Sequence, residues 1–303
     1  MTAPAWFTEA LAVPAGTGET GAGGVPIRYR TWGEPGAPGV VLVHGGAAHS
    51  RWWDHVAPLL VEGRRRVVAL DLSGHGDSGR APAYDLHRWA AELRAVVAAS
   101  GVGERPTLIG HSMGGFVTLT AALTYGEELA GAVAVDSPVK DRSPEERAAR
   151  SRRAFGPARV HPDRDALLAR FRTIPEQDGD LPWVHAHIAE HSIRAVDGGW
   201  TWKFDPQIFG GIGLTPGELG RPGCRVALFR AEHGLVPADM GEMVVDRMGR
   251  PAPVVELPGA GHHVMIDQPL ALVAALRTLL ADWENPVPDA WNRSTAPAQA
   301  AAR

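Results

Sequence analysis

The chain has 303 residues, with 30 lysines and arginines against 34 aspartates and glutamates, so its formal net charge at pH 7 is −4. A protein that binds nucleic acid through its phosphates needs a basic face, so this balance argues against a nucleic-acid partner. Apolar residues make up 45% of the chain and charged residues 21%, a composition typical of a soluble globular protein. The single cysteine, Cys224, excludes an intrachain disulfide and a cysteine-based metal site.

The amino-terminal segment does not resemble a secretory signal. It lacks a basic start and carries Glu9 where a signal peptide would be apolar. A helix that spans a bilayer needs a run of about 18 apolar residues, and the sequence contains no such run. We therefore expect a cytoplasmic protein without a membrane segment.

Short β-rich segments alternate with helical segments, which indicates an α/β fold with a mostly parallel sheet covered on both faces. Residues 5–13 and 25–32 are interpreted as opening strands on either side of a glycine-rich loop, 16–24. Continuous apolar runs, which are typical of buried parallel strands, follow along the chain. These predicted strands span residues 39–43, 66–72, 106–109, 130–135, 225–229 and 254–257, and helices are predicted at 84–100, 113–125 and 269–283.

The segment 139–220 interrupts this alternation. Its first half is rich in arginine and its second half in tryptophan. We interpret it as a helical cap inserted into a core formed by residues 1–138 and 221–285. The end of the chain, 286–303, is rich in proline and alanine and is predicted to be a flexible tail.

The strongest functional signal is the sequence Gly-His-Ser-Met-Gly at residues 110–114. This G-x-S-x-G pattern lies between a predicted strand and a predicted helix, the context in which a tight turn exposes a serine hydroxyl. The glycines matter because side chains at those positions would clash within the turn. We therefore predict that Ser112 is a nucleophile, with an ordinary helix N-cap as the alternative.

A serine hydroxyl needs a base to remove its proton. Of the 13 histidines, His262 is distinguished because Gly261-His262-His263 follows the last predicted strand. The carboxyl ends of parallel strands meet at one edge of the sheet, where ligands bind in open α/β folds. His262 is the predicted base, and His263 is predicted to pack beside it or to line the substrate pocket.

Four motifs in order resemble those of the α/β-hydrolase family. His44-Gly45-Gly46 is similar to its oxyanion loop, and residues 71–78 match its D-x-x-G-x-G-x-S turn. Residues 110–114 resemble its nucleophile elbow, and residues 258–262 its histidine loop. The resemblance spans roughly residues 25–285 and implies an eight-stranded, mostly parallel sheet with a cap domain in the place of the insertion. It also implies an oxyanion hole formed by the backbone N–H groups of Gly46 and Met113.

The third catalytic residue departs from the common family pattern. Gly234 stands where most members carry the acid. Asp136, after the strand that follows the nucleophile helix, is the favoured candidate because some members carry their acid there. Glu232 is the alternative acid, and a third option is that neither residue serves, which includes Asp239.

Two further motifs compete with this interpretation. Residues 187–191 fit H-x-x-E-H, a zinc-protease pattern, and residues 16–21 fit G-x-G-x-x-G, a dinucleotide-binding pattern. The first lies in the predicted cap, and the second is not followed by a helix. We therefore expect neither a metal nor a cofactor.

The predicted function is a serine hydrolase that cleaves an apolar or aromatic carboxylic ester or lactone through an acyl-enzyme. Trp183 in the cap, together with His263, is predicted to contact this small-molecule substrate. A C–C bond hydrolase acting next to a ketone and a non-catalytic ligand-binding protein are the alternatives. Epoxide hydrolysis is disfavoured because those relatives carry aspartate where Ser112 stands. The sequence predicts no membrane partner and leaves the oligomeric state open, a homodimer included.

Overall fold

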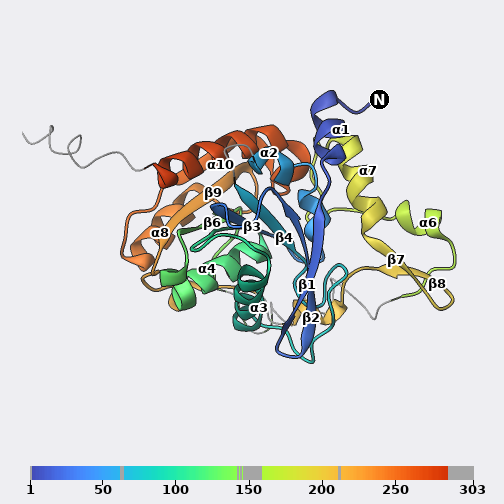
Figure 1. Cartoon of the computed structure of the whole chain (residues 1–303), viewed down its shortest axis with the longest axis horizontal. Helices are drawn as coiled ribbons and strands as arrows, with labels where there is room; N and C mark the ends of the chain where they lie inside the picture. Colours follow the sequence, from blue (N-terminus) through green and yellow to red (C-terminus); the bar gives the residue numbers. More distant parts are fainter. Residues whose placement is uncertain are drawn as a thin grey trace, which may run out of the picture.

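A computed structural model describes residues 2–61, 65–141, 143, 145, 159–210 and 213–285. Its centre is an eight-stranded sheet in the order β1-β2-β4-β3-β5-β6-β9-β10 (Figure 1). The strands are β1 (Gly16–Ala22), β2 (Val25–Trp32), β3 (Gly39–Val43), β4 (Arg66–Leu70), β5 (Thr107–His111), β6 (Gly131–Val135), β9 (Arg225–His233) and β10 (Val254–Gly261). β1 and β2 are antiparallel and β2 joins β4 antiparallel, whereas every pair from β4 to β10 is parallel. The expected α/β-hydrolase sheet is confirmed.

Helices cover both faces of the sheet (Figure 1). Alternate residues of each central strand point to opposite faces: Val40 and Leu42 join one hydrophobic cluster, and Val41 and Val43 join the other. The first cluster includes residues of α1 (Ala5–Ala12), α2 (Ala57–Val61), α9 (Val264–Asp267) and α10 (Pro269–Glu284). The second includes residues of α3 (Leu86–Ala99), α4 (Met113–Tyr125) and α8 (Ala238–Met248).

The interpretation of residues 5–13 as a strand is wrong, because they form α1. Phe7 and Ala10, three residues apart, are the buried residues of this helix. The spacing of two apolar residues in so short a segment does not distinguish a helix from a strand, and here packing decides. The aromatic ring of Phe7 lies 5.7 Å from that of His55, next to α2.

The prediction of a glycine-rich loop at 16–24 is also wrong, because residues Gly16–Ala22 form the edge strand β1. Its glycines make room for side chains of β2. A Cβ on Gly16 would lie 2.6 Å from Oγ1 of Thr31, and a Cβ on Gly18 would lie 2.4 Å from the ring of Tyr29. The G-x-G-x-x-G pattern therefore belongs to a β-hairpin and not to a strand–turn–helix unit.

The inserted segment lies beside the sheet (Figure 1). It contains α6 (Arg164–Leu168), α7 (Pro182–His191) and, in addition to the expected helices, a hairpin of β7 (Ile193–Val196) and β8 (Gly199–Trp202). The short 3₁₀ helices are η1 (Ser50–Trp53), η2 (Gly126–Glu128), η3 (Pro206–Phe209) and η4 (Pro216–Glu218).

The insertion contacts loops at the carboxyl ends of the strands. The N–H of Gly76, after β4, donates to the carbonyl of Lys203 at 2.7 Å, and the N–H of Leu181 donates to Ile266, after β10, at 3.2 Å. The insertion therefore lies at the sheet edge where Ser112 was expected.

The predicted tail, 286–303, and many of the arginines of the insertion lie outside the described residues. Within the described part of the chain, no helix is both long and apolar enough for a bilayer crossing.

Candidate active site

Ser112 stands on the turn between β5 and α4, with φ 53° and ψ −118°. Non-glycine residues rarely adopt positive φ, and this strained turn projects the serine side chain beyond the strand. The flanking glycines permit it. A Cβ on Gly110 would lie 2.1 Å from the carbonyl oxygen of Gly114, and a Cβ on Gly114 would lie 2.4 Å from that of His44. The expected strand, turn and helix therefore surround Ser112.

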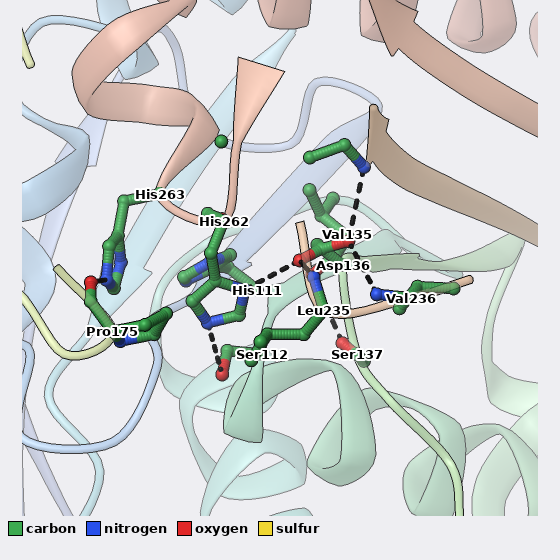
Figure 2. Close-up of polar contacts among 12 residues, drawn as sticks. His111, Ser112, Val135, Asp136, Ser137, Pro175, Leu235, Val236, His262 and His263 are labelled. Carbon is green, nitrogen blue, oxygen red and sulfur yellow. Dashed lines mark hydrogen bonds and ion pairs between the residues drawn. The ribbon is translucent and has the colours of Figure 1, made fainter. Parts of the chain in front are cut away.

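His262 follows β10 and points its ring toward Ser112 (Figure 2). Its Nε2 lies 3.1 Å from Oγ of Ser112, and its Nδ1 lies 2.6 Å from Oδ2 of Asp136. A carboxylate can only accept, so Nδ1 carries the hydrogen and Nε2 is left to accept the serine proton. Three side chains from the ends of β5, β6 and β10 thus form a continuous hydrogen-bonded chain.

Asp136 is fully buried, and its backbone has φ 45°. Besides His262, its carboxylate accepts three backbone N–H groups: that of Ala231 near the end of β9 at 3.2 Å, and those of Leu235 and Val236 just after it at 2.8 and 3.3 Å. Burial alone would raise the pKa of Asp136, but the hydrogen bond from His262 and these backbone N–H groups outweigh it and lower the pKa. Asp136 is therefore held as a carboxylate, the form that stabilises a histidine cation.

Gly234 makes this arrangement sterically feasible. A Cβ at this position would lie 2.4 and 2.5 Å from the two carboxylate oxygens of Asp136. The position where the family pattern places its acid is thus occupied, in space, by the carboxylate of Asp136. The alternative acid, Glu232, is exposed and accepts the N–H of Gly259 at 2.7 Å, and it makes no hydrogen bond to His262.

The loop after β3 lies against the elbow. A Cβ on Gly45 would lie 3.4 Å from Cβ of Ser112, and one on Gly46 would lie 3.7 Å from Sδ of Met113 and 3.2 Å from the ring of Phe209. Met113 is the first residue of α4, where N–H groups lack intrahelical acceptors and the helix dipole favours an anion. Both residues predicted for the oxyanion hole therefore lie beside Ser112.

His44 holds this loop in place. Its Nε2 accepts the N–H of Leu72 at 3.1 Å, so its Nδ1 carries the hydrogen and donates to the carbonyl of Gly45 at 2.7 Å. Burial lowers the pKa of His44, which keeps this ring neutral. The carbonyl of Gly45 is thereby turned toward His44.

The two predicted substrate-contacting residues lie in different surroundings. The ring of His263 lies 4.7 Å from that of His262 and 5.5 Å from that of Trp52, and its backbone N–H donates to Oε1 of Gln177 in the insertion at 2.7 Å. Trp183 packs on a hydrophobic cluster of the core. A role of either residue in substrate binding stays a prediction.

Sequence reasoning missed two residues of the site. His111 lies behind His262 in Figure 2, and its Nε2 donates to the backbone carbonyl of His262 at 2.8 Å. The signal was present, since His111 is inside the elbow motif. Gln177 carried no sequence signal, because its contact depends on how the insertion packs against the loop after β10.

The H-x-x-E-H pattern forms part of an ion-pair network. Nε2 of His187 lies 3.1 Å from Oδ2 of Asp54, and His191 lies close enough for the three residues to face one ion. However, Asp54 already pairs with Arg30 at 2.9 Å and with Arg51 at 3.3 Å. Two cationic neighbours disfavour a divalent cation at this position.

The sequence model of the alpha/beta hydrolase family matches residues 40–276. Epoxide hydrolase A of Mycobacterium tuberculosis is 37% identical to this chain in an alignment that covers 86% of this chain and 96% of that protein. Lipase LipV of the same organism is 24% identical, covering 84% and 98%. Among solved structures, the thioesterase domain from the curacin biosynthetic pathway superposes with a TM-score of 0.72 at 23% identity, covering 88% of this chain and 99% of that domain.

Proposed function

The chain belongs to the alpha/beta hydrolase family, and from this premise we propose that it is a serine hydrolase that cleaves a carboxylic ester or lactone with an apolar or aromatic part. The observation that carries the proposal is the hydrogen-bonded chain from Ser112 through His262 to Asp136, with distances of 3.1 and 2.6 Å. Such an arrangement converts a weakly nucleophilic hydroxyl into one that attacks a carbonyl.

In the proposed reaction, Oγ of Ser112 bonds to the substrate carbonyl carbon as its proton moves to Nε2 of His262. The carbonyl oxygen becomes an anion held by the N–H groups of Gly46 and Met113, each worth about 3 kcal/mol in the transition state. His262 then protonates the leaving alcohol as its bond to the acyl carbon breaks. Water next loses a proton to His262 and bonds to the acyl carbon. The bond from that carbon to Oγ of Ser112 then breaks as His262 returns the proton to Oγ, which releases the acid and restores the enzyme.

The surroundings of the oxyanion loop favour an apolar substrate. Phe209 and Met113 lie next to Gly46, and the buried rings of Trp52 and His263 contact each other in a tilted arrangement, with their centroids 5.5 Å apart. Ligand pockets of this kind bury apolar groups and use few polar ones for orientation. We therefore infer an ester or lactone with an aliphatic or aromatic group next to the reacting carbonyl.

Similarity to an epoxide hydrolase raises a second candidate function, which the chemistry of Ser112 disfavours. A carboxylate that opens an epoxide forms an ester, whose carbonyl water can then attack. A serine that opens an epoxide forms an alkyl ether instead. That ether has no carbonyl, so water could not regenerate the enzyme by the route described above.

The experiment is labelling with a fluorophosphonate probe, combined with turnover of an aryl ester, a lactone and an epoxide. We expect covalent labelling of the wild-type protein, its loss in Ser112→Ala, and turnover of the ester or the lactone. A protein that never labels but binds an apolar ligand would favour the non-catalytic alternative. Turnover of the epoxide alone would refute the proposal.

A further inference from the structure

Three imidazole rings meet at the active site, more than proton transfer by His262 requires. The ring centroid of His111 lies 4.8 Å from that of His262 and 5.6 Å from that of His263. All three residues are buried. Each ring offers one nitrogen to a group of three nitrogens that all lie within 4.8 Å of one another.

Each ring has one nitrogen hydrogen-bonded to an oxygen that can only accept. Nε2 of His111 faces the carbonyl of His262 at 2.8 Å, Nε2 of His263 faces the carbonyl of Pro175 at 3.1 Å, and Nδ1 of His262 faces Asp136 at 2.6 Å (Figure 2). These nitrogens therefore carry the hydrogens. Histidines that bind metal ions are oriented in the same way, by donating their other N–H to a backbone carbonyl or a carboxylate.

The remaining nitrogens carry lone pairs. Among the residues that the structure describes, Nδ1 of His111 and Nδ1 of His263 are buried without a hydrogen-bond partner, and Nε2 of His262 has the hydroxyl of Ser112 as its partner. A buried nitrogen without a partner is costly and calls for a ligand or a function. Nδ1 of His111 also faces the place where Gly45 lacks a side chain, since a Cβ there would lie 3.1 Å from it.

We propose that His111, His262 and His263 form a binding site for a divalent transition-metal ion of the Zn²⁺ class, and that the ion inhibits the enzyme. Imidazole nitrogens suit such ions, and three histidines leave a fourth position for water or for Oγ of Ser112. Zinc–nitrogen bonds of about 2.0–2.1 Å require ligand nitrogens roughly 3.3 Å apart, so the rings would rotate inward on binding. The inhibitory effect rests on the proposed function, because the ion would occupy the nitrogen that must accept the serine proton.

The test uses the full-length protein in a chelator-free buffer. Co²⁺, which gives visible absorption bands in a tetrahedral site, reports binding without any need for activity. Zn²⁺ inhibition of aryl-ester hydrolysis is measured in parallel, and each protein is compared with its own metal-free rate. The key variant is His263→Gln, whose amide can still donate to the carbonyl of Pro175. The matched control is His191→Gln, in the group formed by Asp54, His187 and His191.

We expect one equivalent of Co²⁺ to produce the bands in the wild type and in His191→Gln but not in His263→Gln. Zinc should inhibit the wild type reversibly, and His263→Gln should need about tenfold more zinc or higher, because even the loss of a residue that supports a metal ligand weakens binding by roughly that factor. Absence of both bands and inhibition in the wild type would overturn the proposal. Equal sensitivity of His263→Gln and the wild type, or loss of binding in His191→Gln alone, would also overturn it. Bands that disappear in His263→Gln would support the site even if no ester were hydrolysed, in which case the proposed function fails separately.

Discussion

Replacing Gly234 by alanine tests whether Asp136 acts through its contact with His262. The new Cβ would lie 2.4 Å from Oδ2 of Asp136, the oxygen that accepts from Nδ1 of His262 at 2.6 Å. Cβ atoms essentially never approach other atoms within 3.0 Å, so the carboxylate must retreat by about 0.6 Å. Because φ at Gly234 lies outside the left-handed region, alanine introduces this clash without backbone strain.

The size of the effect follows from the hydrogen bond that is weakened. A hydrogen bond to a charged group contributes about 1.5–3 kcal/mol. If that contribution is lost in the transition state, where His262 is positively charged, kcat falls roughly 10- to 100-fold. Stability should fall as well, because the same carboxylate accepts the backbone N–H groups of Ala231, Leu235 and Val236.

The assay is steady-state hydrolysis of an aryl ester, with thermal unfolding measured on the same samples. Gly21→Ala is the matched control, since a Cβ on Gly21 meets nothing within 4 Å and its φ also lies outside the left-handed region. In an Asp136→Asn background, Gly234→Ala should reduce kcat little further, because the interaction it weakens is already lost. An equal loss of kcat in both backgrounds, or wild-type turnover by a folded Gly234→Ala protein, would refute the reasoning.

Two further predictions concern substitutions of the carboxyl groups themselves. Asp136→Asn should lower kcat by roughly three to four orders of magnitude, because His262 would lose the tautomer that catalysis requires. Glu232→Gln should change kcat less than about tenfold. The reverse ranking in measured rates would transfer the acid role to Glu232. Glu92 is buried with Oε2 accepting the N–H of Ser73, and burial raises its pKa from 4.5 to about 7. The folded state therefore binds a proton that the unfolded state releases, so stability falls as the pH rises from about 4.5 to about 7. Glu92→Gln should remove this loss and raise the free energy of unfolding by up to about 3 kcal/mol near pH 8 but little near pH 4. Denaturant unfolding of the wild type and the variant at both pH values checks this. The same difference between the two proteins at both pH values would contradict the assignment.

Local patterns predicted much of the fold. The helix at Met113–Tyr125 and the strand at Gly39–Val43 occupy their predicted residues, because continuous apolar runs and helical periodicity are properties of adjacent residues. The errors at 5–13 and 16–24 arose where a short segment takes its structure from other segments that it packs against or pairs with. Gly16–Ala22 has few side chains of its own and becomes a strand by pairing with β2.

The sequence by itself was enough to predict which residues would serve as the nucleophile and the base. Ser112 lies in a motif whose glycines serve its own turn, and His262 follows the last strand, so short-range patterns carry both predictions. Only the tertiary structure decided which carboxylate reaches His262, because that depends on whether the end of β6 or of β9 points at Nδ1. Because Gly234 has no side chain, the carboxylate of Asp136 can occupy the space beside it, although the two residues are 98 positions apart along the chain. The meeting of His111 with His263, and of Gln177 with the histidine loop, was likewise decided by packing between segments whose separation in sequence says nothing about their distance in space.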